Sequence, residues 1–201
     1  MLWIYSVLSN SRNRHSLRAG FGLIELLVSI SILTIVMGAI MAQQNSYNGA
    51  VLLRSQAYDL ALSIREVQLA TVSVQGFAGD YRTNLGIYFD LDTSSLYGDR
   101  QAFHVYRDNS SPNIYDPVEK YGVQGNLDKR FEISEIRNEN GNSIEQLSII
   151  FQRPNFDAKF YNTSGDEINS QFVEIDVSEI GGGAVRTVEV TKTGQISVQN
   201  I

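Results

Sequence analysis

One uninterrupted apolar stretch, over residues 21–42, constrains the fold more than any other feature of the chain. It reads FGLIELLVSISILTIVMGAIMA, and its only charged residue is Glu25. As an α-helix, its roughly 22 residues span about 33 Å, which is close to the thickness of the hydrocarbon core of a bilayer. The stretch therefore predicts a transmembrane helix over residues 21–42.

The charges on either side of this stretch predict its orientation. Residues 1–20 contain Arg12, Arg14 and Arg18 and no acidic residue, whereas the whole chain has a net charge of −6. Positive residues beside a membrane helix favour the cytoplasmic side. We therefore expect a single-pass protein of the inner (cytoplasmic) membrane, with residues 1–20 inside and the rest of the chain outside the cytoplasm.

Glu25 is unusual because a carboxylate in an apolar helix costs about 2–3 kcal/mol at the bilayer centre, and less near a helix end. One interpretation is that an acid in the first turn interacts favourably with the positive end of the helix dipole. The other is that Glu25 pairs with a cation on another molecule. The residues alone leave both interpretations open.

Residues 18–25 read RAGFGLIE, with Gly20 and Phe21 at the boundary between the basic leader and the apolar stretch. This pattern resembles the processing site of type IV prepilins and type II secretion pseudopilins. The resemblance implies that a prepilin peptidase removes residues 1–20 by cutting between Gly20 and Phe21, and that the new Phe21 amine is N-methylated. It also implies that Glu25 pairs with the Phe21 amine of a neighbouring subunit.

Two positions depart from the family pattern. Gly22 stands where a hydroxyl residue is commoner, and Ala42 stands where the family has a helix-kinking proline. Because Ala42 lacks the proline ring, we expect the helix to be straighter here.

An amphipathic helix is expected to continue the membrane segment over residues 43–75. Asn45, Asn48 and Gly49 weaken the join, so a local break there is plausible on propensity. Farther on, apolar and small residues recur at helical spacing, and we expect them to face the head. They are Ala57, Leu60, Ala61, Ile64, Val67, Gln68, Thr71 and Val74.

Residues 76–201 predict a β-rich head after a helix stop at 76–80. Period-two alternation marks short strands separated by turn residues, which favours antiparallel sheet and an α+β fold with the helix packed on it. The expected strands lie near 85–90, 103–106, 131–136, 147–152, 158–161, 172–177, 185–191 and 195–198, with loops at 91–101 and 107–128. Residues 58–70, 149–158 and 185–198 resemble GspH/FimT-type minor pseudopilins, in which Gly194 would occupy the last hairpin turn.

Several catalytic and ligand-binding classes find little support. The chain has no cysteine, and its histidines, His15 and His104, lie far apart, so we expect no metal ligand set and no cofactor. His104 is expected to be a surface residue of a strand. The acids Asp80, Asp90, Asp92 and Asp99 lack calcium-loop spacing and are expected to be solvated. Glycines 181–183 are expected to form a flexible hairpin connection.

These patterns favour a filament subunit over an enzyme, localised in the inner membrane and incorporated into a periplasmic or extracellular filament. The resemblance implies four kinds of partner: the prepilin peptidase, other pilin or pseudopilin subunits, the inner-membrane assembly platform and membrane lipid. An alternative is a DNA-uptake pseudopilin, but residues 185–201 carry only Arg186 and Lys192 against Glu189, so we do not expect DNA as a partner. Another is an unprocessed single-pass surface protein.

Overall fold

A computed structural model of the chain describes residues 22–73, 84–109, 113–122, 124–152 and 154–200. The chain divides into two units, Met1–Gln44 and Asn45–Ile201. Helix α1, Leu23–Val72, contributes its first part to one unit and its remainder to the other. The helix stop expected at residues 76–80 lies outside the described residues.

Residues 45–49 of α1 are helical, so the local break considered there is wrong. Asparagine and glycine each lower helix propensity, by up to about 1 kcal/mol, which is a weak local preference. The long run of helix-compatible residues on both sides outweighs that preference.

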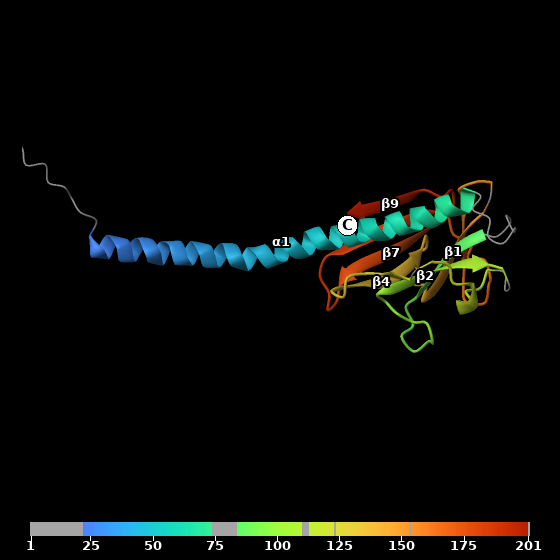
Figure 1. The fold of residues 1–201 in the computed structure, drawn as a ribbon, viewed down its shortest axis with the longest axis horizontal. Helices are drawn as coiled ribbons and strands as arrows, with labels where there is room; N and C mark the ends of the chain where they lie inside the picture. The colour runs from blue at the N-terminus through green and yellow to red at the C-terminus, as the bar shows by residue number, and fades with distance from the viewer. Residues whose placement is uncertain (1–21, 74–83, 110–112, 123, 153, 201) are drawn as a thin grey trace, which may run out of the picture. The chain divides into compact units, whose positions relative to one another are not determined.

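Among the described residues, nine strands follow α1 and form two antiparallel sheets, which confirms the α+β class (Figure 1). One sheet has the order β3-β2-β1-β5-β6, and the other has the order β4-β7-β8-β9. The strands are β1 (Asn84–Asp90), β2 (Ala102–Asp108), β3 (Gly125–Asn126), β4 (Phe131–Asn138), β5 (Gln146–Phe151), β6 (Ala158–Tyr161), β7 (Phe172–Glu179), β8 (Val185–Thr191) and β9 (Ile196–Asn200).

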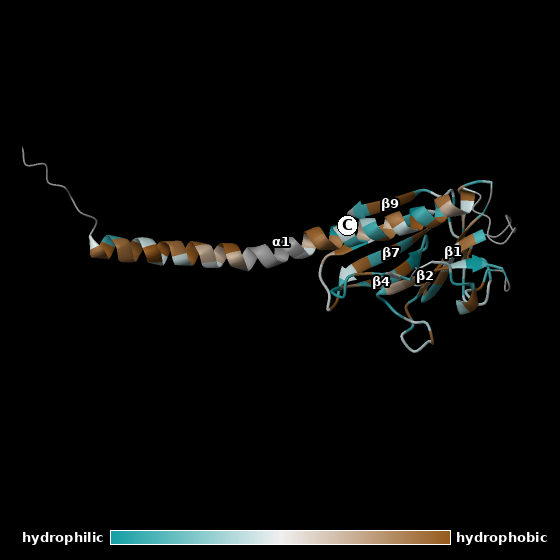
Figure 2. Cartoon of the chain, in the orientation of Figure 1, coloured by the Kyte–Doolittle hydropathy of each residue, from teal (hydrophilic) through white to brown (hydrophobic). Residues whose placement is uncertain are grey.

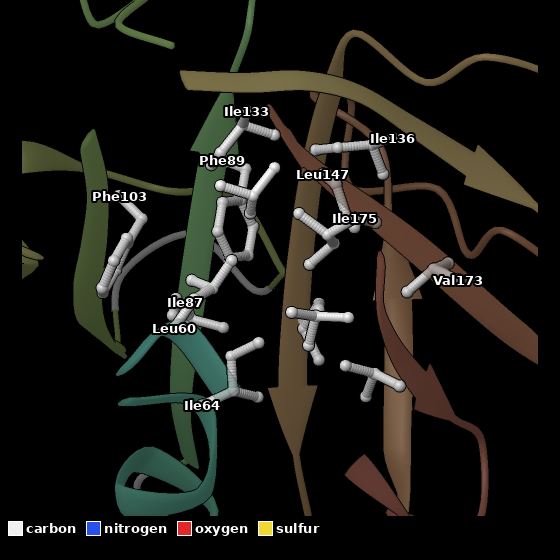
Figure 3. Packing of buried hydrophobic residues seen from close by; sticks show 14 of the residues in the cluster. Leu60, Ile64, Ile87, Phe89, Phe103, Ile133, Ile136, Leu147, Val173 and Ile175 are labelled. Atoms are coloured by element: carbon white, nitrogen blue, oxygen red, sulfur yellow. The ribbon is translucent and has the colours of Figure 1, made fainter. Parts of the chain in front are cut away.

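The hydrophobic core of the second unit lies between α1 and the two sheets. Leu60 and Ile64 of α1 lie close to Ile87 of β1, and side chains from both sheets complete the cluster (Figure 3). The helical stripe expected to face the head is confirmed at its main positions, since Ala57, Leu60, Ile64, Val67, Gln68 and Thr71 are buried. Ala61 is half-buried, and Val74 lies outside the described residues.

The first sheet is covered on both faces, which the sequence did not indicate. Residues 85–90 of β1 are all buried because β1 is the central strand and Tyr115 covers its outer face. The ring of Tyr115 stacks on Tyr88 at 4.8 Å and on His104 at 5.1 Å. The expectation that His104 is a surface residue is therefore wrong, since it is only 9% exposed.

The region 107–128 was expected to be a loop, and this expectation is partly wrong. Strand β2 extends to Asp108, and the two residues of β3 pair with Ala102 and Phe103. A short 3-10 turn, Pro117–Glu119, is capped by Asp116, whose carboxylate accepts a hydrogen bond from the Val118 amide. Strand β3 and the 3-10 turn are too short to show a periodic pattern in the sequence.

A buried glutamine links α1 to two distant loops of the head. The Nε2 group of Gln68 donates to the carbonyl oxygens of Phe156 at 2.8 Å and Gly194 at 2.9 Å, and its Oε1 accepts from Arg65 at 2.6 Å. Gly194 lies in the turn between β8 and β9, as expected, with a φ of +80°. The helix is thus tied to the last hairpin by directed hydrogen bonds as well as by apolar packing.

An ion-pair network lies on the second sheet. The guanidinium of Arg137 contacts Glu135 at 3.2 Å, Glu174 at 3.1 Å and Asp176 at 2.5 Å. Asp176 is buried and also accepts a hydrogen bond from Thr187 at 2.6 Å. Burial by itself would lower the pKa of Arg137, but the three carboxylates around its guanidinium together raise this pKa.

Candidate functional site

The first part of α1 exposes an apolar surface. The segment Leu23–Met41 is long and apolar enough to cross a membrane, and none of it is buried. The exposed fraction of Ile24 is 71% and that of Leu33 is 60%. Figure 2 shows this part of the helix as predominantly hydrophobic. Such a surface needs a non-aqueous environment or a partner that covers it.

The hydroxyl side chains of this segment are satisfied within the helix. Ser29, Ser31 and Thr34 each donate to the carbonyl oxygen four residues earlier, at distances of 2.7, 2.8 and 2.8 Å. A hydroxyl bonded in this way presents little unsatisfied polarity to lipid. Glu25 is therefore the one charged group that the described part of this segment exposes.

Glu25 lies in the first turn of α1. Its amide and that of Leu26 donate to the carbonyl oxygen of Gly22, at 3.0 and 3.1 Å, which begins the helical hydrogen bonding. Its side chain is exposed, and no cation among the described residues lies within ion-pair distance of it. Gly20 and Phe21 lie outside the described residues. The arrangement presents a carboxylate at the side of an apolar helix, where a second molecule can reach it.

Comparison with known proteins gives one match. The prokaryotic N-terminal methylation motif matches residues 15–41. This range includes Gly20, Phe21 and Glu25, and it ends before the head. No curated protein and no solved structure matches the chain. The chain thus combines an N-terminal methylation motif, an apolar N-terminal helix and a head of helix packed on antiparallel sheets.

The aspartates that the sequence suggested as solvated loop acids differ in their exposure to solvent. Asp90 is 2% exposed, so the expectation that it is solvated is wrong. Its carboxylate accepts hydrogen bonds from Tyr88, Ser95, Gln146 and the Asp92 amide. Four donors match the acceptor capacity of a carboxylate, which makes its burial tolerable.

Asp92 is half-buried, and hydrogen bonds from Ser94 lower the pKa of its carboxylate. Asp80 lies outside the described residues. In the described part of the chain no group of three or more histidine, cysteine, aspartate or glutamate side chains could hold a metal ion.

Glycines 181–183 connect β7 to β8, which confirms the expected hairpin connection. Their φ angles are +95°, +96° and +144°, which residues with a side chain rarely adopt. A cluster of tyrosines on the outer face of the first sheet was not identified from the sequence, because its members lie far apart along the chain.

Proposed function

We propose that this chain is a pilin-like subunit of a type IV pilus or a type II secretion pseudopilus. A prepilin peptidase removes residues 1–20, the Phe21 amine is methylated, and the apolar helix anchors the subunit in the inner membrane with its head outside the cytoplasm. The assembly platform then moves the subunit into a helical filament. The work of the subunit is structural and not enzymatic.

The observation that carries this proposal is the position of Glu25. It lies within the methylation motif, in the first turn of an exposed apolar helix, with no cation near it among the described residues. Cleavage before Phe21 creates an α-amine, whose reference pKa of about 7.7–8.0 leaves it largely protonated at neutral pH. In apolar surroundings an unpaired charge is costly, so a neighbouring subunit's Phe21 amine stabilises Glu25 and fixes the register between the helices.

Processing is tested by intact-mass measurement of the protein extracted from membranes of its native host. We expect a mass that lacks residues 1–20 and includes one added methyl group, with a fragment spectrum that begins at Phe21. A protein that retains residues 1–20 in a host with an active prepilin peptidase contradicts the proposal and supports an unprocessed single-pass surface protein.

The pairing role is tested with Glu25→Ala and Glu25→Gln. Both variants are expected to remain in the membrane fraction, since removing a charge favours insertion. Their incorporation into filaments is expected to fall at least about tenfold, because the loss of one partner of a buried pair costs more than the 1.4 kcal/mol that tenfold requires.

Glu66→Gln is the matched control, because Glu66 is a glutamate of the same helix that lies in the head unit. Its incorporation is expected to be normal. Equal incorporation of the Glu25 variants and this control would show that Glu25 is not paired in the filament.

The finer part of the proposal is that the chain is a minor subunit of the GspH/FimT type. The amphipathic helix and the last hairpin support it, because Gln68 of the one is bonded to Gly194 of the other. Quantitative mass spectrometry of purified filaments tests it. A minor subunit is expected at a small fraction of the most abundant pilin, whereas an equal or larger amount would identify a major subunit.

A further inference from the structure

A hollow of about 260 Å³ opens on the outer face of the first sheet, on the side away from α1's core contacts. It is lined by residues from four separate parts of the head: strand β1, the loop 91–101, the region around Tyr115, and β5 with residues 162–163. None of these residues belongs to the N-terminal motif. Its volume admits one small group, of the size of a single amino-acid side chain.

Three tyrosine rings form the aromatic wall of this hollow. Tyr115 stacks on Tyr88 with centroids 4.8 Å apart, and Tyr97 stands against Tyr115 at 5.6 Å with the ring planes at 89°. Tyr97 is 37% exposed, which places it at the rim of the hollow. The π face of a tyrosine ring attracts a cation.

A buried carboxylate adds negative charge beside the Tyr88 ring, whose hydroxyl donates to it at 3.2 Å. The buried carboxylate of Asp90 lines the hollow, and no lysine or arginine is among the described residues that do so. The ion pairs in the described part of the chain involve other acids. His104 lies under Tyr115, and burial lowers its pKa, so it supplies no charge at neutral pH.

Several polar groups of the lining are already bonded within the chain. Gln146 donates to Asp90 and accepts from Thr163. The side-chain oxygen of Asn162 accepts from the amides of residues 164 and 166, and its nitrogen donates to the Asp166 carboxylate. A sugar would find few partners for its hydroxyl groups here. A cation needs no directed hydrogen bond and is attracted by ring faces and by charge.

We propose that this hollow binds one ammonium or alkylated ammonium group. The group lies beside the rings of Tyr97 and Tyr115, and the carboxylate of Asp90 supplies the negative charge. Two sources offer this chemistry: a lysine side chain of a partner protein, and a free quaternary amine such as choline. Glu25 plays no part in it, so it stands independently of the proposed function.

The test uses the full-length protein in maltoside micelles, whose head group is neutral and does not compete. Saturation-transfer proton NMR follows the titration of choline and of its neutral carbon analogue, in which carbon replaces the quaternary nitrogen. We expect saturable choline binding with a millimolar Kd, and binding of the analogue at least about tenfold weaker. Equal binding of the two, or no saturable choline binding, would overturn the proposal.

Tyr97→Leu removes the ring at the rim but keeps apolar bulk, and it is expected to weaken choline binding about five- to tenfold. Tyr58→Leu is the matched control, because Tyr58 is an exposed tyrosine of α1 that does not line the hollow. Asp90→Asn is expected to weaken choline but not the neutral analogue. The proposal is wrong if Tyr97→Leu binds choline as well as Tyr58→Leu does.

A second pair of ligands distinguishes the sources. Nα-acetyl-lysine methylamide is compared with its norleucine counterpart, which has the same chain length without the charge. Tighter binding of the lysine compound than of choline supports a partner's side chain, and tighter binding of choline supports a free quaternary amine. Preference for the norleucine compound over the lysine compound counts against a cation site.

Discussion

Gly194→Ala is expected to destabilise the head far more than an ordinary glycine replacement. A Cβ atom at this position would lie 1.8 Å from the carbonyl oxygen of Phe156 and 2.6 Å from Nε2 of Gln68. Real Cβ contacts are essentially never shorter than 3.0 Å, so the Phe156 backbone must move by roughly 1 Å. That movement breaks the hydrogen bonds that Gln68 donates to both loops.

The magnitude follows from two contributions. The positive φ of +80° costs an alanine about 1–2 kcal/mol. Two buried polar groups, Nε2 of Gln68 and the carbonyl oxygen of residue 194, are left unsatisfied, and each costs about 1–3 kcal/mol. The sum is about 3–8 kcal/mol. Because a domain is stable by only about 5–15 kcal/mol, this loss threatens folding itself.

Gly141→Ala is the matched control. Gly141 also has a positive φ, of +76°, but its added Cβ would meet nothing within 4 Å. Only the conformational cost of about 1–2 kcal/mol remains. The difference between the two variants isolates the effect of the close approach at Gly194.

Urea denaturation of the full-length protein in maltoside micelles measures both variants. Near-ultraviolet circular dichroism follows the transition, since it reports the packing of the tyrosines that the head contains. We expect the free energy of unfolding to fall by at least about 2 kcal/mol more for Gly194→Ala than for Gly141→Ala. Equal destabilisation would refute the role assigned to the Gln68 contacts.

Two further predictions concern charges in the head. Arg137→Ala leaves the buried Asp176 without its cation and is expected to cost about 3–5 kcal/mol of stability. Arg130→Ala breaks an exposed pair and is expected to have a much smaller effect. Urea denaturation compares the two variants, and equal destabilisation would contradict the importance of the network. Burial lowers the pKa of His104 in the folded protein. As the pH falls below about 6.5, His104 therefore binds a proton in the unfolded chain before it does so in the folded one. The free energy of unfolding declines from that pH down to the pKa of His104 in the folded protein. His104→Phe keeps a ring beneath its aromatic neighbour and is expected to flatten this decline, and an unchanged pH profile would show that His104 does not cause it.

Much of the fold could be predicted from the sequence because local periodicity records which face is buried. The helical spacing of Leu60, Ile64 and Val67 indicated the face of α1 that packs on the sheets, and alternation located eight of the strands near their observed positions. Strand β3 was not predicted, because two residues are too few to show a periodic pattern. The burial of the outer face of β1 was not predicted, because Tyr115 contacts it from a loop and no local sequence pattern records such a contact.

The N-terminal motif and the hollow on the first sheet also differ in whether a local sequence pattern can reveal them. The N-terminal motif is contiguous, so its resemblance to a prepilin processing site implied roles for Gly20, Phe21 and Glu25 from one stretch of sequence, and the match over residues 15–41 spans these positions. The hollow lined by Tyr88, Tyr97 and Tyr115 joins residues from distant parts of the chain, and only the fold of the head brings them together. Asp90 illustrates the difference, because in sequence it was one loop acid among several.

The exposed apolar helix and its single carboxylate make different demands on their surroundings. Lipid covers Ile24 and Leu33 as well as another helix does, because hydrocarbon tails are as apolar as leucine side chains. Lipid offers no cation to Glu25, whereas in the proposed filament a processed neighbouring copy would bring both an apolar surface and a cationic terminus. The free-energy difference between a subunit in the bilayer and one in a helix bundle therefore depends on close packing and on the state of this carboxylate, more than on hydrophobic burial. The apolar surface accepts many registers between helices, whereas a charge pair accepts few. If subunits assemble as proposed, we therefore expect Glu25 to determine which arrangement of helices forms.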